Sequence, residues 1–374
     1  NAATGQTPNQ GTEAISDYYG KVNSNIHRGA HKLAREATIA HEAARSKIAE
    51  HLNTLHAHEI IFTSGTTDSI NLISNTLTLS GKINTDDHVI ISGLEHHSNI
   101  VPWQMLCERT GAKLKVIPVL DDGTIDMQVF KAMLNERVKV IALSHVSNAL
   151  GTINPVKEII QLARDYDAYI LIDGAQAAPH MRVDVQDLDC DFYVFSGHKT
   201  YGPTGIGVLY GKENQLNSLP PWRGGGEMIK EVTFENTTYN DLPFKFEAGT
   251  PDIEGAISLA RAIDYMNSIG METIAKHEHI LEQAASSALA EVPGINFYGT
   301  SPHKAAVISF RVDGIHHYDM GTLMDQMGVA VRTGHLCCQP LMARFGITGT
   351  VRASFAAYNT LDDVDRLVTA VRKA

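Results

Sequence analysis

Cysteine is scarce in this chain, with four residues in 374. None of the four forms a Cys-x-x-Cys pair, which excludes a disulfide-based scaffold and indicates a reducing compartment. We therefore expect a cytoplasmic protein.

Long apolar runs and an excess of positive charge are also missing. No stretch reaches the roughly 18 consecutive apolar residues of a membrane span. The net charge of −11, from 31 basic and 42 acidic residues, argues against partners such as nucleic acid or anionic membranes. The chain starts at Asn1 without the pattern of a signal peptide, and we expect the front of the domain to be trimmed.

The composition, with 43% hydrophobic residues and 30 glycines, is that of a globular protein. Short β-branched runs alternate with helical patterns such as 126–136 and 155–166. Seven runs predict strands, at 59–63, 88–91, 113–119, 139–143, 169–172, 192–195 and 207–210. This alternation predicts an α/β fold with a mostly parallel, seven-stranded sheet between helices.

The pattern changes after Pro251, which predicts a second, smaller α/β domain. Helices are expected at 253–269, 271–291 and 319–327, and a last helix is expected from 361, whose N-terminus Thr360 can cap. Strands are expected at 306–312 and 328–332. The stretch 236–250 has little periodicity. We expect residues 1–20 to belong with the small domain, 21–251 to form the large domain, and 252–374 the small one.

Three features of the large domain stand at strand ends, where open α/β sheets bind ligands. Gly65, Thr66 and Thr67 lie between a strand and a helix, which suits a phosphate but also an ordinary turn. Asp173 ends an apolar strand and is either a helix cap or half of an ion pair. Lys199 closes another strand, and a Schiff base to a carbonyl cofactor is one explanation for such a lysine. Pyridoxal phosphate needs a lysine, a carboxylate and a phosphate cup.

With these residues the chain resembles the fold-type I pyridoxal-phosphate enzymes, and more closely the group II, SufS-type cysteine desulfurases of the class-V aminotransferase family. The motif Ser196-Gly197-His198-Lys199 is one of eight segments that match in the order of that family. The eight segments are 25–29, 62–67, 95–103, 147–151, 173–176, 196–199, 246–251 and 332–337.

The resemblance implies a role for each matching residue. Lys199 would bind the cofactor and shuttle the Cα proton, Asp173 would pair with the pyridinium nitrogen, and His96 would stack on the ring. Cys337 would be the nucleophile, taking sulfur from L-cysteine as a persulfide. By the same resemblance, Gln176 would hydrogen-bond the ring oxygen. The residues that would hold the phosphate are Thr66, Thr67, Ser196, His198 and, from a neighbouring subunit, Thr250. The residues that would bind the substrate are Asn148, Arg352, Arg332 and His27.

The resemblance also implies a homodimer and a SufE- or SufU-like protein that accepts the sulfur for iron–sulfur cluster assembly. Selenocysteine lyase activity is a close alternative, and a kynureninase-like lyase is a further one, although such enzymes need no loop cysteine. Arg332 and His335 could favour the Cys337 thiolate. We expect Cys107, Cys190 and Cys338 to be packing or structural residues.

Some residues depart from the usual family pattern or invite another interpretation. Leu336 stands where the family commonly has a second histidine, and Asp68 stands where a glutamate is common. Arg223 stands where many members have an acidic residue. The 18 histidines suggest a metal site, and His27 and His31 have helical spacing, but no third ligand is evident, so no metal is expected. The residues His41, His51, His56 and His58 are predicted to be solvated, as is the helix face over 36–50.

Overall fold

The computed structural model describes all residues, 1–374, and its largest element is a seven-stranded sheet. The strand order is β1-β7-β6-β5-β4-β2-β3, and only β7 runs antiparallel to its neighbours. The strands are β1 (Ile60–Thr63), β2 (His88–Ser92), β3 (Lys113–Ile117), β4 (Val138–Ser144), β5 (Tyr169–Asp173), β6 (Phe192–Ser196) and β7 (Gly207–Gly211). The predicted mostly parallel sheet is confirmed.

Helices cover both faces of this sheet, as a nearly continuous apolar strand pattern requires. One face packs against α2 (Lys32–Leu52), α6 (Val156–Ala163) and α9 (Ile253–Ile269), and the core there includes Ile48, Ile159 and Leu259. The other face packs against α3 (Thr66–Ser80), α4 (Val101–Thr110) and α8 (Glu213–Ser218). The shorter helices are α5 (Met127–Met133), α7 (Val185–Leu188) and the 3₁₀ turns Ala57–Glu59, His97–Asn99, Gly197–Lys199 and Phe244–Phe246.

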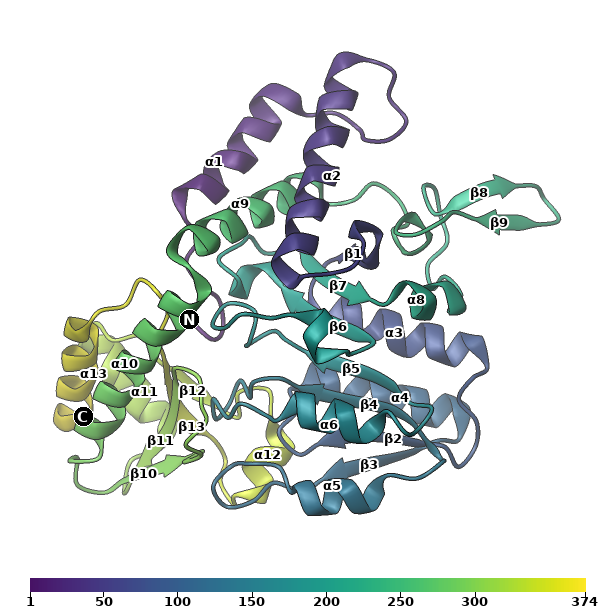
Figure 1. Cartoon of the computed structure of the whole chain (residues 1–374). Coiled ribbons are helices and arrows are strands. Elements are labelled where there is room, and N and C mark those ends of the chain that lie inside the picture. The colour runs from purple at the N-terminus through teal and green to yellow at the C-terminus, as the bar shows by residue number, and fades with distance from the viewer.

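A second, antiparallel sheet forms the C-terminal part, at the lower left of Figure 1, in the order β10-β11-β13-β12. Its strands are β10 (Ile295–Tyr298), β11 (Val307–Val312), β12 (Arg332–Gly334) and β13 (Thr350–Ser354). The helices of this part are α10 (Met271–Leu289), α11 (His317–Gln326), α12 (Gln339–Arg344) and α13 (Leu361–Lys373). Thr360 caps α13 as expected, in a capping box with Asp363. The strand predicted at 328–332 instead begins at Arg332, and Gly328, with a left-handed φ of 77°, lies in the turn after α11.

The N-terminal segment lies between the two sheets. Asn1 donates from its amide to the carbonyl of Ser354 at 2.7 Å, and Gln176 donates to the carbonyl of Ala2 at 2.7 Å. Helix α1 (Asn9–Asp17) follows and packs along α9, and a π-helical turn spans Tyr18–Val22. The first residues therefore contact both the small sheet, at Ser354, and the loop that follows β5 of the large sheet, at Gln176. The domain boundaries themselves remain a prediction.

A hairpin of β8 (Ile229–Val232) and β9 (Thr237–Tyr239) projects from the body of the molecule (Figure 1). Its second strand lies in the stretch that showed little periodicity in the sequence. The side chains of this hairpin are largely exposed, and Phe234 at its tip is fully exposed, so neither face has to be apolar. None of the helices is long and apolar enough to cross a bilayer.

Candidate active site

A cavity of about 220 Å³ lies where β4, β5 and β6 end, between the large sheet and strands β12 and β13 of the small one. Twelve of the fourteen predicted site residues line this cavity. They are Thr66, Thr67, His96, Asn148, Asp173, Gln176, Ser196, His198, Lys199, Arg332, Cys337 and Arg352. A larger hollow of about 660 Å³ between α1, α2 and α9 contains none of them.

One end of the cavity is built to hold an anion. The Oγ atom of Ser196 lies 2.8 Å from both the backbone nitrogen and the Oγ1 atom of Thr66, at the N-terminus of the 15-residue helix α3. Gly65 has a φ of 148°, and its backbone passes so close to Gly207 that a Cβ on Gly207 would lie 2.3 Å from the Gly65 Cα. Hydroxyl groups and free helix N–H groups together suit a phosphate.

The other end presents a buried carboxylate. One oxygen of Asp173 accepts from the backbone N–H of Ala175 at 2.9 Å, and the other oxygen has no hydrogen-bond partner in the chain. Burial raises the pKa of Asp173, since a charge is costly away from water. A cationic N–H group placed in the cavity would satisfy the free oxygen and restore the charged form.

Lys199 follows β6 in a 3₁₀ turn and reaches into the same cavity. Its amine makes no hydrogen bond or ion pair within the chain, and burial lowers its pKa although Asp173 opposes the shift. A lysine with a lowered pKa is a better nucleophile and base near neutral pH. Lys199 can therefore bind a carbonyl group and transfer a proton.

His96 lies on the loop after β2, and its Nδ1 atom is 2.8 Å from the Oγ atom of Ser98. Burial lowers the pKa of His96 to about 4, so that the imidazole is neutral at pH 7 and can lie against an aromatic ring. The preceding residue, Glu95, is buried and accepts from the Asn99 amide at 2.7 Å and from the Ser144 backbone at 3.1 Å. Burial raises the pKa of Glu95 to about 7.

Two arginines from the small sheet face the cavity side by side. Arg332 on β12 is the direct cross-strand partner of Arg352 on β13, and neither forms an ion pair with a carboxylate of the chain. Arg352 is 4% exposed and donates to the carbonyl of Asn148 at 2.7 Å, while its Nε atom has no partner. Burial lowers the pKa of Arg352 to about 10. Because like charges directly opposite destabilise a sheet, this pair predicts a bound anion.

Cys337 lies on a short loop between β12 and α12, and its side chain lines the cavity. Leu336 and Cys337 both have left-handed backbones, with φ values of 54° and 58°. The carbonyl of Cys337 accepts from the backbone of His97 at 2.8 Å, and its N–H group donates to the ring of His335 at 3.1 Å. The loop thus holds a partly exposed thiol at the cavity in an unusual backbone conformation.

His27 and Thr250 do not line this cavity. Thr250 lies instead in a separate hollow of about 200 Å³ with Arg28 and Glu227. His27 is held between Glu227, at 3.0 Å, and Glu42, at 3.1 Å.

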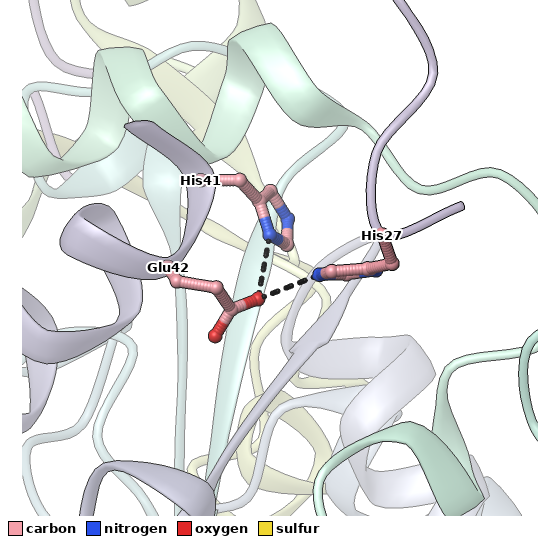
Figure 2. A group of neighbouring side chains, drawn as sticks. All are labelled: His27, His41 and Glu42. Carbon is pink, nitrogen blue, oxygen red and sulfur yellow. Dashed lines mark hydrogen bonds and ion pairs between the residues drawn. The ribbon is translucent and has the colours of Figure 1, made fainter. Parts of the chain in front are cut away.

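Figure 2 shows Glu42 between His27 and His41, whose ring nitrogens both lie 3.1 Å from one carboxylate oxygen. His41 is fully buried, so the prediction of a solvated residue is wrong. The helical pairing of His27 with His31 is also wrong, because His27 precedes α2. The three side chains could ligate a metal ion, but Arg45 already binds Glu42, at 3.0 Å. The absence of a metal remains a prediction.

The Arg45 guanidinium also donates to both oxygens of Glu247, at 2.7 and 2.9 Å, and to the Ile60 carbonyl at 2.8 Å. Burial opposes the ionisation of Glu42, yet hydrogen bonds from His27, His41 and Arg45 outweigh it and hold the pKa of Glu42 far below its usual range. The helix face over 36–50 is therefore not simply solvated, because Arg45 is buried in it.

Sequence reasoning did not assign a role to Glu95 or Ser98. Glu95 joins the ends of β2 and β4, and Ser98 fixes the His96 ring through a side-chain hydrogen bond. Only the position of these residues beside His96 in a matching segment could have drawn attention to them, since the partner of Glu95 on β4 is distant in sequence.

Comparisons with known proteins identify relatives of this chain. The family model for class-V aminotransferases matches residues 1–367. A probable cysteine desulfurase of Vibrio cholerae is 47% identical over 373 residues, covering all of this chain and 92% of the relative. A cysteine desulfurase of Synechococcus elongatus is 48% identical, and the chain spans 59% of its length. The structure of a cysteine desulfurase from Thermococcus onnurineus is 39% identical, with a TM-score of 0.96, all of this chain covered and 93% of the other.

Proposed function

The chain belongs to the cysteine desulfurases of the class-V aminotransferase family, which depend on pyridoxal phosphate, and we propose that it converts L-cysteine to L-alanine through a persulfide on Cys337. The observation that supports this most is the position of Cys337, which lines the same cavity as Lys199 and Asp173. Kynureninase-like lyases need no cysteine there.

The residues of the cavity fit the cofactor. Lys199 would bind it covalently, Asp173 would accept from its ring nitrogen, and Gln176 offers a buried Oε1 atom that has no partner in the chain. The phosphate would be held by Thr66, Thr67, Ser196 and His198, and the ring would be covered by His96. When bound, pyridoxal phosphate supplies an electron sink for negative charge at the substrate Cα.

The residues of this chain would bind and orient the amino acid. Arg352 and Arg332 would receive its carboxylate, since a guanidinium matches a carboxylate with two hydrogen bonds. Lys199 would remove the proton from Cα and later return one, because its lowered pKa lets it act as a base near neutral pH.

Cys337 would then attack the substrate sulfur as a thiolate. The new bond joins Cys337 Sγ to that sulfur, and the carbon–sulfur bond of the substrate breaks with its electron pair left on the carbon skeleton, which is protonated to alanine. The net reaction is L-cysteine plus the Cys337 thiol giving L-alanine plus a Cys337 persulfide. The atoms and electrons balance without an added oxidant.

The persulfide would pass its outer sulfur to a SufE- or SufU-like carrier protein for iron–sulfur cluster assembly. Partial exposure of the Cys337 loop supports this step, because the acceptor thiol has to reach the sulfur. A cytoplasmic, reducing location would keep that thiol reduced.

A homodimer would explain the position of two residues that lie outside the cavity. Thr250 is exposed and does not line the cavity of its own chain, which supports a contact with the phosphate in another subunit's site. His27 stands beside Arg28 and is held by Glu227. We assign both residues to the edge of a partner's cavity.

The test is the substitution Cys337→Ala in the holoenzyme. We expect the visible absorbance of the bound cofactor to be retained, while alanine formation from L-cysteine and the sulfur adduct on the protein, detected by intact mass, are lost. Cys107→Ala, on the outer helix α4, is the matched control and should behave as the wild type. Full desulfurase activity in Cys337→Ala would refute the proposal.

A further inference from the structure

Cys338 follows Cys337 at the start of α12 and is fully buried. Its Sγ atom is 3.2 Å from the amide oxygen of Asn148. The amide nitrogen of Asn148 donates to the carbonyl of Leu336 at 2.8 Å, and the backbone carbonyl of Asn148 accepts from Arg352 at 2.7 Å. One asparagine thus connects the buried thiol, the loop and the buried arginine of the cavity.

The donors and acceptors of this contact have only one consistent arrangement. The Leu336 carbonyl can only accept, so the amide nitrogen of Asn148 has to face it. The amide oxygen then faces Cys338, whose sulfur has to be a protonated thiol that donates. The second N–H of the Asn148 amide has no partner in the chain, and Asn148 lines the cavity.

We infer that Cys338 is a positioning residue, whose thiol orients the Asn148 amide so that Asn148 holds the Cys337 loop and keeps one N–H free for the substrate. This role rests on the proposed function. It acts on the loop through the Leu336 carbonyl, next to the two residues with left-handed backbones. Removing the donor would leave a buried amide oxygen unpaired and free the amide to turn.

The surroundings of Cys338 argue against its use as a second sulfur carrier. A carrier thiol has to be exposed and ionised, whereas Cys338 is fully buried and burial raises its pKa to about 12. Its neighbour Cys337 is partly exposed. The two adjacent cysteines therefore have different tasks.

The experiment compares Cys338→Ala with Cys338→Ser, which keeps a donor, in the holoenzyme. Cys190→Ala removes another fully buried thiol, just before β6 and at the end of that strand opposite the cavity residue Ser196, and serves as the control. Three quantities are measured: kcat for L-cysteine, KM for L-cysteine, and the rate at which iodoacetamide alkylates Cys337, read from peptide masses.

We expect Cys338→Ala to raise KM and the alkylation rate of Cys337, and to lower kcat/KM, by about 2- to 10-fold, the range for one neutral hydrogen bond. Cys338→Ser should stay within about twofold of the wild type, since its hydroxyl still donates to Asn148. Cys190→Ala should leave all three quantities unchanged.

Equal losses in Cys338→Ala and Cys338→Ser, or no change in either, would overturn the inference. So would sulfur found on Cys338 in the wild-type enzyme after reaction with L-cysteine, a measurement that needs no variant. The alkylation rate does not depend on turnover. A wild type that makes no alanine, with faster alkylation in Cys338→Ala alone, would therefore reject the proposed function and keep the positioning role.

Discussion

At the scale of single residues, Lys199 shows how burial prepares a side chain for chemistry. Its amine has no partner in the chain, and burial lowers its pKa against the opposing effect of Asp173. When the pKa of a lysine is lower in the folded state than in the unfolded state, its charged form destabilises the folded state. The folded state therefore favours the neutral form. The neutral amine is the form that can attack a carbonyl group or accept a proton.

We predict that Lys199→Ala abolishes alanine formation and leaves the cofactor without a covalent attachment. After borohydride treatment and dialysis, the wild type should keep the reduced cofactor on the Lys199 peptide, detectable by mass, while the variant should release it. Lys131→Ala, which removes an exposed lysine of the same domain, is the control. A cofactor adduct that survives in Lys199→Ala would place the attachment elsewhere.

Most of the candidate site could be predicted from the sequence because its residues follow strand ends as short linear motifs. Asp173 and Ser196 each close a buried strand, Lys199 follows three residues after Ser196, and parallel strands bring such ends to one edge. The contact between Cys338 and Asn148 could not be predicted, since 190 residues separate the partners and neither residue alone indicates the other. The buried state of His41 was missed for the same reason.

At the scale of elements, α2 is attached to the large sheet by a polar contact within an apolar core. Arg45 on α2 is 1% exposed and donates to the Ile60 carbonyl of β1 and to Glu247, which is 7% exposed. The charged composition of residues 36–50 predicted a solvated helix face, because a buried arginine and an exposed one look alike in sequence. The hairpin of β8 and β9 was not predicted, because its side chains pack against no core and therefore follow no apolar pattern.

We predict that Arg45→Met destabilises the folded protein by about 3 to 5 kcal/mol, because it leaves the Glu247 carboxylate buried without its partner. Urea unfolding of the cofactor-free protein, followed by circular dichroism, measures the change. Lys47→Met on the same helix removes a partly exposed lysine and should cost no more than about 1 kcal/mol. If both variants unfold at the same urea concentration, the buried contact does not stabilise the fold.

At the scale of the whole molecule, the two sheets have separate cores but share one cavity. Asp173 and Lys199 come from the large sheet, whereas Arg332, Cys337 and Arg352 come from the small one. Closure of the cavity therefore depends on how the two parts sit together, and Asn1 and Ala2 contribute by contacting both. Thr250 remains outside, and a second subunit is the simplest explanation for its place in the motif pattern.

A mixed dimer tests whether Thr250 serves the partner's site. Thr250→Glu should be inactive as a homodimer, because its carboxylate would repel the cofactor phosphate, and Lys199→Ala should be inactive as well. Thr250 is exposed, so the substitution should leave the fold intact. Coexpression with two different tags isolates the mixed dimer, in which one site combines an intact Lys199 with an intact Thr250 from the other chain.

We expect about half of the wild-type activity per dimer, since a two-fold dimer has two equivalent sites. A mixed dimer without activity would mean that Thr250 acts within its own chain, and a monomeric mass of 40.8 kDa in light scattering would exclude the dimer itself.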